Sequence, residues 1–197
     1  MVDYAQLSDK DVIRHAREGR ESAFRELIKR YERPVFSIIY RMVHDRELSE
    51  DLAQDTFIKV LNALDRYNPE YKFSSWIFKI AHNTTIDHIR KKEPETLSLE
   101  GSPHARTQEQ AKATSFTAVD TAEDPEHYTH SQELGSEIEN AIQELRPAYR
   151  EAILLWHVEG RPYDEIAEIM DLPLGTVKTY IHRGRNELRK KLEHLRT

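Results

Sequence analysis

The chain has 197 residues, of which 32% are charged and 38% hydrophobic, and its formal net charge is −6. This balance suits two small helical units better than one large core. It has no cysteine, which excludes disulfides and thiolate metal sites, and it shows no signal-peptide core and no apolar run of membrane-spanning length, so we expect a cytoplasmic protein without membrane insertion.

Apolar residues recur at helical spacing from the N-terminus onward. Ser8 is expected to begin a first helix that Gly19 ends, and Ser22 to begin a second. Pro34 can occupy the first turn of a third helix, which would run from Val35 to Val43.

The pattern continues through two further helices. A capping pattern at Ser49 precedes an amphipathic helix that includes Leu52, Ala53, Phe57, Ile58, Leu61 and Leu64. Asn68-Pro69 breaks this helix, and Ser74 or Ser75 is expected to cap a last one that ends near Arg90.

The segment 93–135 differs in composition from its surroundings. It holds nine acidic residues against two basic ones and almost no large apolar residues. Such a segment buries too little surface to offset its ordering entropy, so we expect a flexible acidic linker. The sequence therefore predicts an all-α protein with two helical domains, 1–92 and 136–197, and the linker between them.

A helix-turn-helix is predicted in the second domain. Its first helix carries Ile166, Ala167 and Met170, and the small side chain of Ala167 allows the second helix to cross closely. Thr176 is placed to cap that second helix, which would leave basic and polar residues on its outer face. A helical hairpin with a solvated basic face is the alternative, but the agreement of core, cap and basic face favours DNA binding. The outward residues are Lys178, Thr179, His182, Arg183 and Arg185.

Aromatic and basic residues are interleaved before the last helix of the first domain. Tyr67, Tyr71 and Phe73 lie near Lys72 and Lys79, a pattern that suits unstacked single-stranded bases. Composition alone favours a core position for these aromatics instead.

The helix that follows carries a polar face. Asn83, Asp87 and Arg90 lie at i, i+4 and i+7, where they could meet duplex DNA or only solvent.

Two long stretches of the sequence resemble a known protein family. The run EDLAQDTFIKVLNALDRYNPEYKFSSWIFKIAHNTTIDHIRKK resembles region 2 of the sigma-70 family, and the pattern ELRPAYREAILL…GRPYDEIAEIMDLPLGTVKTYIHRGRNELRKKL resembles region 4. Their order and the short linker resemble the extracytoplasmic-function (group IV) sigma factors. The resemblance implies a bacterial RNA polymerase subunit that recognises promoters and helps to open them.

The resemblance also implies roles for individual residues. One group would contact the β′ clamp helices of core polymerase, with the β flap as a further polymerase contact, and two groups would contact promoter DNA. Many relatives are held inactive by an anti-sigma factor, which is therefore an expected partner. The implied groups are Asp51, Gln54 and Asp55 for polymerase; Tyr71, Lys72, Phe73, Ser74, Ser75, Trp76, Asn83, Asp87 and Arg90 for the minus-10 element; and Thr176, Lys178, Thr179, His182, Arg183 and Arg185 for the minus-35 element.

Other functional classes find less support. The histidine pairs His127/His130 and His82/His88 lack a metal-site spacing, so no metal and no cofactor is expected. No nucleotide loop or paired catalytic carboxylates occur, which predicts no enzymatic activity. Two rivals remain: a helix-turn-helix regulator that acts without being a polymerase subunit, and a helical adaptor that antagonises another sigma factor.

Overall fold

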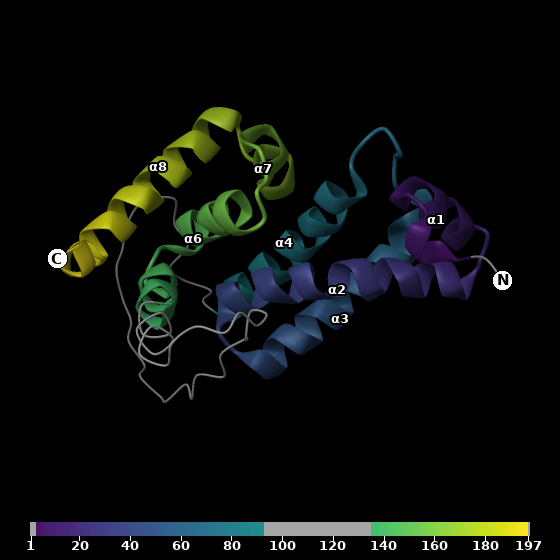
Figure 1. Ribbon diagram of the computed structural model, residues 1–197, viewed down its shortest axis with the longest axis horizontal. Coiled ribbons are helices and arrows are strands. Elements are labelled where there is room, and N and C mark those ends of the chain that lie inside the picture. Colours follow the sequence, from purple (N-terminus) through teal and green to yellow (C-terminus); the bar gives the residue numbers. More distant parts are fainter. Residues whose placement is uncertain (1–2, 93–134, 197) are drawn as a thin grey trace, which may run out of the picture.

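The computed structural model describes residues 3–92 and 135–196, and within these ranges it is helical without strands (Figure 1). The predicted linker lies outside the described residues, apart from Gly135 at its end.

The first unit is built from four long helices and two short 3-10 turns. Helices α2, α3 and α4 pack lengthwise, and α1 covers one end of α2 (Figure 1). The prediction for α1 is confirmed, since the side chain of Ser8 caps it and Gly19 follows with φ of +80°. The elements are η1 Tyr4–Gln6, α1 Asp9–Arg17, α2 Glu21–Val43, α3 Arg46–Ala63, η2 Leu64–Arg66 and α4 Phe73–Lys92.

The expected break at Pro34 is absent from helix α2. The sequence predicts two helices here, but the structure has one continuous helix with Pro34 inside it. Leu27, Val35 and Ile39 are almost completely buried along its length. Burial on both sides of the proline holds the helix together despite the missing N–H, although proline ordinarily costs a helix interior about 3 kcal/mol.

Three of the predicted helix starts in the first unit are also wrong. Helix α2 begins at Glu21 after Arg20, so Ser22 lies in its first turn and does not precede it. Asp45, not Ser49, caps α3, because its carboxylate accepts the N–H of Leu48 at 3.0 Å. Ser49 is fully buried inside the helix and donates to the carbonyl of Asp45. Helix α4 begins at Phe73, so Ser74 and Ser75 lie in its first turn and do not precede it.

The second unit consists of a helical segment over 135–143 followed by four elements and a last short turn. Helix α6 continues directly into a π-helical turn, and α7 and α8 form the helix-turn-helix. The elements are α6 Pro147–Ile153, η3 Leu154–Val158, α7 Tyr163–Met170, α8 Leu174–Lys191 and η4 Glu193–Arg196.

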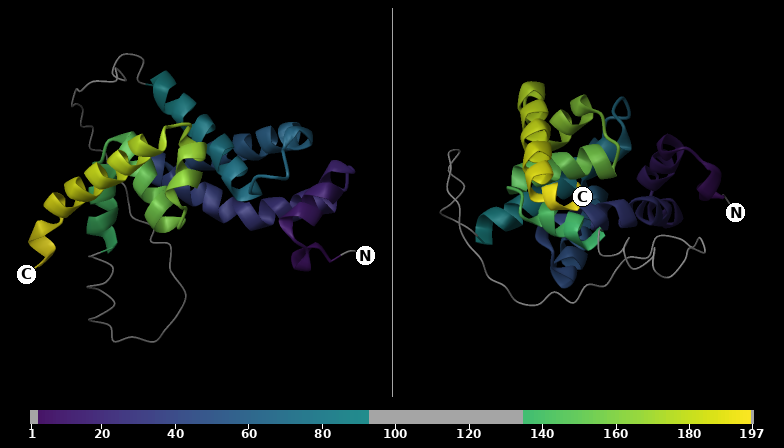
Figure 2. Two further views of the ribbon diagram at one scale, coloured as in Figure 1. Left: turned by 90° about the horizontal axis from the view of Figure 1, so that it is seen from above. Right: turned by 60° about the vertical axis from the view of Figure 1, so that its left-hand side comes forward.

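The two units pack against each other, and the buried core runs from one into the other. Helix α7 lies along α4, and α6 contacts α2, as the views in Figures 1 and 2 show. Arg150 strengthens this junction. Its guanidinium donates to the carbonyl of Met42 at 2.7 Å and to carbonyls at the end of segment 135–143. Burial lowers the pKa of Arg150, so these carbonyls stabilise a charge that is largely removed from water.

Candidate nucleic-acid interface

Helix α8 exposes one face and buries the other. Val177 and Ile181 are buried against α6 and α7, at 0% and 2% exposure. The five predicted outward residues, Lys178, Thr179, His182, Arg183 and Arg185, are all exposed. The sequence thus placed the outer face of this helix correctly.

The beginning of α8 differs from the prediction. The helix begins at Leu174 after Pro173, and no side chain caps it. Thr176 lies in the first turn, where its own N–H bonds to the carbonyl of Pro173 at 2.9 Å. The tight turn before it uses Asp171 in the left-handed conformation, with φ of +54°. Thr176 is therefore half-buried and is not the cap.

Gly184 sets how closely α8 approaches α6, a feature that the sequence analysis missed. A Cβ at this position would lie 2.9 Å from Cγ1 of Ile153 and 3.5 Å from Cβ of Tyr149. A glycine in a helix interior usually lowers helix stability, so its position midway along α8 was the available signal.

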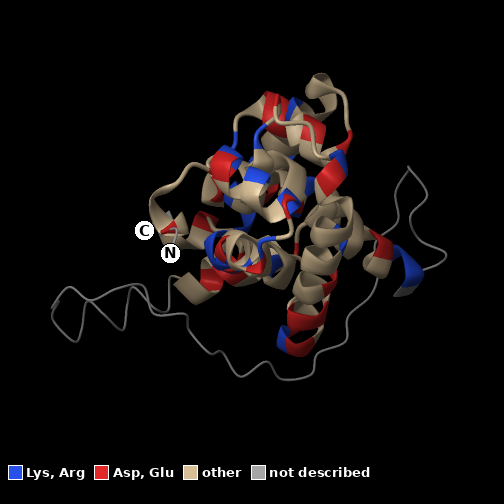
Figure 3. Cartoon of the chain, turned by 90° about the vertical axis from the view of Figure 1, so that its right-hand side faces the viewer, with Lys and Arg blue, Asp and Glu red and all other residues tan. Residues whose placement is uncertain are grey.

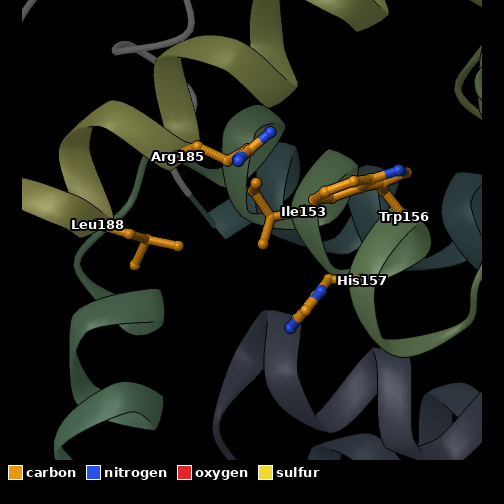
Figure 4. A pocket seen from close by; sticks show the side chains of 5 residues that line it. All are labelled: Ile153, Trp156, His157, Arg185 and Leu188. Carbon is orange, nitrogen blue, oxygen red and sulfur yellow. The ribbon is translucent and has the colours of Figure 1, made fainter.

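Polar contacts orient several side chains on α8. Asn186 lies 3.0 Å from the ring Nε2 of His182 and accepts a hydrogen bond from Arg189 at 2.7 Å. The Arg185 guanidinium lies 5.3 Å from the centre of the Trp156 ring, and Figure 4 shows Arg185 extending from α8 toward that ring. Such a cation–π contact restricts the arginine while its charge stays at the surface.

A shallow hollow of about 250 Å³ lies beside this pair, lined by Ile153, Trp156, His157, Arg185 and Leu188 (Figure 4). Trp156 is half-buried, so it contributes to packing and also faces the hollow.

The loop and first turn before α4 divide into buried and exposed residues. Phe73 is only 3% exposed, and its ring makes edge contacts with Tyr31 and Tyr67 at centroid distances of 5.3 Å. Trp76 packs beside it at 5.6 Å and is half-buried, whereas Tyr71 is 58% exposed. The core interpretation of the aromatics thus applies to Phe73 and Tyr67, and Tyr71 is the large exposed aromatic of this loop.

The polar residues of the same loop contact the second unit. Glu165 of α7 accepts from the ammonium of Lys72 and from the hydroxyl of Ser75, the latter at 3.0 Å. Ser74 accepts a hydrogen bond from Arg161 at 2.8 Å. Farther along α4, Asn83, Asp87 and Arg90 are exposed as predicted.

Helix α3 carries a third candidate surface. Asp51, Gln54 and Asp55 are exposed, and Figure 3 shows acidic turns on the first half of α3, the lowest helix in that view. Ile58 and Leu61 are also exposed, at 57% and 52%. The amphipathic pattern predicted for this helix grouped these two residues with Leu52 and Leu64, which are buried. Ile58 and Leu61 lie seven and ten residues after Asp51, and four and seven residues after Gln54. This spacing places them on the acidic face, opposite the buried Leu52 and Val60.

The described histidines do not form a metal site. No group of three or more metal-ligating side chains occurs within residues 3–92 and 135–196. His82 instead pairs with the buried carboxylate of Glu151 at 2.5 Å, across the contact between the two units. His127 and His130 lie outside the described residues.

Comparison with known proteins agrees with this arrangement. A family model described as sigma-70 region 2 matches residues 27–95, and one for sigma-70 region 4 matches residues 136–188. The ECF RNA polymerase sigma factor SigW of Bacillus subtilis is 35% identical over 96% of this chain and 100% of its own length. The RNA polymerase sigma-H factor of Pseudomonas aeruginosa is 31% identical over 96% of each chain.

Solved structures share the fold. CnrH, in complex with the cytosolic domain of CnrY, matches 94% of this chain and 97% of its own with a TM-score of 0.66 at 22% identity. RpoE of Bartonella quintana, in complex with the anti-sigma factor NepR, matches 86% of this chain and 96% of its own with a TM-score of 0.63 at 22% identity. Within the described part of the chain, no helix is long and apolar enough to cross a membrane.

Proposed function

Since the chain belongs to the sigma-70 family and is an RNA polymerase sigma factor of the extracytoplasmic-function type, we propose that three of its surfaces divide the work of transcription initiation. Helix α3 binds core polymerase, α8 reads the minus-35 element, and the loop before α4 captures minus-10 bases. Residues 1–92 and 136–197 form the two functional domains. The protein acts in the cytoplasm and catalyses no reaction of its own.

The observation that carries the proposal is the pair of exposed, chemically different faces on α8 and α3. The α8 face presents Lys178, Arg183 and Arg185, with hydroxyl and imidazole groups between them. Arginine and lysine on a helix-turn-helix supply contacts to phosphates and base edges. This is the expected chemistry of a minus-35 reader.

The α3 face has the composition of a protein interface. Ile58 and Leu61 provide exposed apolar area, and Asp51, Gln54 and Asp55 provide polar groups beside it. An apolar patch rimmed by polar residues typically marks a site of protein association. We assign it to the β′ clamp helices of polymerase, with the β flap as a second contact for the C-terminal domain.

In the proposed opening step, the loop before α4 captures bases that become unpaired. No nucleotide hydrolysis is needed to separate the strands. Tyr71 offers a large exposed ring on which a base can stack, which contributes about 1–3 kcal/mol per base. Asn83, Asp87 and Arg90 would meet the adjoining duplex. Structural relatives solved with anti-sigma partners support the proposal that this chain has such a partner too.

Run-off transcription with core polymerase tests the function. We expect specific transcripts only when the chain is added. Leu61→Asp should abolish most of them, because it places a charge in the apolar part of the α3 face. Val158→Asp is the matched control, since Val158 is an exposed apolar residue of η3, outside the three proposed surfaces, and the substitution introduces the same side chain.

The rival regulator makes the opposite prediction. A helix-turn-helix repressor would bind its operator tightly without polymerase and would support no transcription from core enzyme. The same assay, paired with duplex binding by the free chain, therefore separates the two classes.

A further inference from the structure

We propose that the free chain closes on itself, with Glu165 of the helix-turn-helix occupying the minus-10 capture loop, and that single-stranded promoter DNA and Glu165 compete for the same loop residues. This inference rests on the proposed function of that loop. The inference adds Glu165 as a competitor of DNA within the same chain.

The contact centres on one buried carboxylate. Glu165 is 8% exposed, and its two oxygens are both engaged by the loop. Oε1 pairs with the ammonium of Lys72, and Oε2 accepts the hydroxyl of Ser75 at 3.0 Å. Arg161, one turn earlier in the chain, lies 3.5 Å from Oε2 and donates to Ser74 at 2.8 Å. We call these five residues the latch.

In the latch, the Glu165 carboxylate accepts the hydrogen bonds that the loop could otherwise donate to a nucleic-acid phosphate. An ammonium and a hydroxyl directed at two anionic oxygens form the donor set that binds a DNA phosphate. A carboxylate presents the same acceptors. A hydroxyl has one proton to donate, so a phosphate contact by Ser75 is incompatible with its hydrogen bond to Glu165 unless the units separate. At Lys72 the negative charge of Glu165 would repel a phosphate that approached the same ammonium.

The charged state of Glu165 agrees with this arrangement. Burial alone would raise the pKa of its carboxyl, but the hydrogen bonds from Lys72 and Ser75 and the charges of Lys72 and Arg161 outweigh that effect and hold the pKa below its ordinary value. Glu165 is thus an anion at neutral pH, and it needs its partners because an unpaired buried charge is costly.

Further contacts surround the latch and hold α7 against α4. The Arg161 guanidinium lies 4.8 Å from the centre of the Phe78 ring. At one end of α7, Asp171 pairs with Lys79 at 3.3 Å, and His82 meets Glu151 farther along α4. Because these contacts cross between the same two units, separating the units breaks them together.

Closure engages the polar groups of one proposed surface and leaves the other two surfaces exposed. Ser75 is 6% exposed and Ser74 is half-buried, whereas the outer residues of α8 and the Asp51–Leu61 face of α3 remain exposed. The closed chain can therefore present α3 to polymerase before the minus-10 loop becomes available. The latch withholds the polar groups of the loop until the units separate, while the Tyr71 ring stays exposed.

The absence of cysteine allows a direct distance measurement. Spin labels at Glu32→Cys on α2 and Asp164→Cys on α7 occupy exposed positions outside the latch. The two positions are close in the closed chain, because Tyr31 packs on Phe73 and the adjacent Ser74 bonds to Arg161 just before α7. Double electron–electron resonance on the free chain should give mainly one short distance. Glu165→Gln should raise the population of longer distances about tenfold, as expected for losing hydrogen bonds to a charged group.

Glu168→Gln is the matched control, because Glu168 is exposed on the same helix and the substitution removes the same charge. It should leave the distances unchanged. If Glu165→Gln fails to fold by circular dichroism, Lys72→Met tests the latch from the other unit and should lengthen the distances as well. A free chain dominated by long distances, or latch variants that leave the distances unchanged, would overturn the proposal.

Competition is measured with a pool of fluorescein-labelled random single-stranded dodecanucleotides and the full chain. Anisotropy should show about tenfold tighter binding by Glu165→Gln than by the natural chain or Glu168→Gln, because the competitor has been removed. Equal affinity for all three proteins would contradict competition.

Run-off transcription keeps the two proposals distinguishable. If no variant supports transcription but Glu165→Gln still opens the chain, the proposed function fails and the closed form remains. If the chain supports transcription but Glu165→Gln neither lengthens the distances nor tightens binding, the latch fails alone.

Discussion

The two surfaces that we assign to promoter DNA are in different states in the free chain. The outer face of α8 is exposed, and its side chains contact mainly one another and neighbours in the same unit. The loop before α4 has its polar groups paired with Glu165 and Arg161 of the other unit. A surface that is ready to bind and a surface that must first be released call for different experiments.

The largest expected effect is on folding stability, and it distinguishes the aromatic residue of the loop that packs in the core from the one proposed to bind DNA. Phe73→Ala should cost about 3–5 kcal/mol of unfolding free energy, because it empties a buried position among Tyr31, Tyr67 and Trp76. Tyr71→Ala should leave the melting temperature nearly unchanged but reduce promoter opening. Thermal denaturation and permanganate footprinting check the two effects. Equal destabilisation by both variants would remove the distinction.

The packing beneath α8 provides the next test. Gly184→Val should destabilise the second unit by about 1–3 kcal/mol, because its side chain would collide with Ile153. Gly175→Ala, also on α8, meets nothing within 4 Å and should be neutral or stabilising. Chemical denaturation of both variants measures the difference, and a tolerated valine at position 184 would show that α6 and α8 are not rigidly packed.

Readout by α8 should depend on Arg185 more than on the tryptophan that supports it. Arg185→Ala should weaken holoenzyme binding to the minus-35 element by about 1–3 kcal/mol. Trp156→Ala should weaken the same binding by about 0.5–1 kcal/mol, because Trp156 affects the readout through its cation–π contact with Arg185, whereas its packing contributes to stability. Lys190→Ala lies outside the predicted contact and serves as the control. Binding titrations at two salt concentrations distinguish these variants, and a larger effect of Trp156→Ala would reverse the assignment.

The smallest expected effect is on pH dependence. The closed form lowers the pKa of Glu165, so this group stabilises closure above its ordinary pKa and that contribution is lost as the pH falls through the lowered value. Long distances between the spin labels should therefore increase on acidification. Glu151, Glu139, Asp171 and His82 also lie in ion pairs across the interface, so the relevant quantity is the difference from Glu165→Gln. The variant should have the flatter profile, and identical profiles would exclude Glu165 as the source.

Local sequence patterns predicted the elements better than their ends. The Ser8 cap and the inward face of α8 followed from spacing alone. The continuous α2 did not, because burial of Val35 and Ile39 outweighs the local effect of Pro34. Thr176 was predicted to cap α8 because threonine is a good capping residue. The turn through Asp171 instead lets the helix begin at Leu174, two residues earlier.

The surfaces were predictable to different degrees. The exposed α3 face could have been found, since Ile58 and Leu61 share a helical stripe with Asp51 and Gln54 and not with Leu52 and Val60. The Glu165 contact could not, because it joins positions about 90 residues apart. Glu165 lies one turn before the buried Ile169, but this spacing does not identify the residues that pair with its carboxylate.

The most direct test measures the distance between the Glu32→Cys and Asp164→Cys labels in two states of one protein. The distance should be short in the free chain and long in the complex of the same chain with core polymerase and an opened promoter. That result would show that the minus-10 loop is released when it is used. A distance that stays the same in both states, in a complex that supports transcription, would contradict the account.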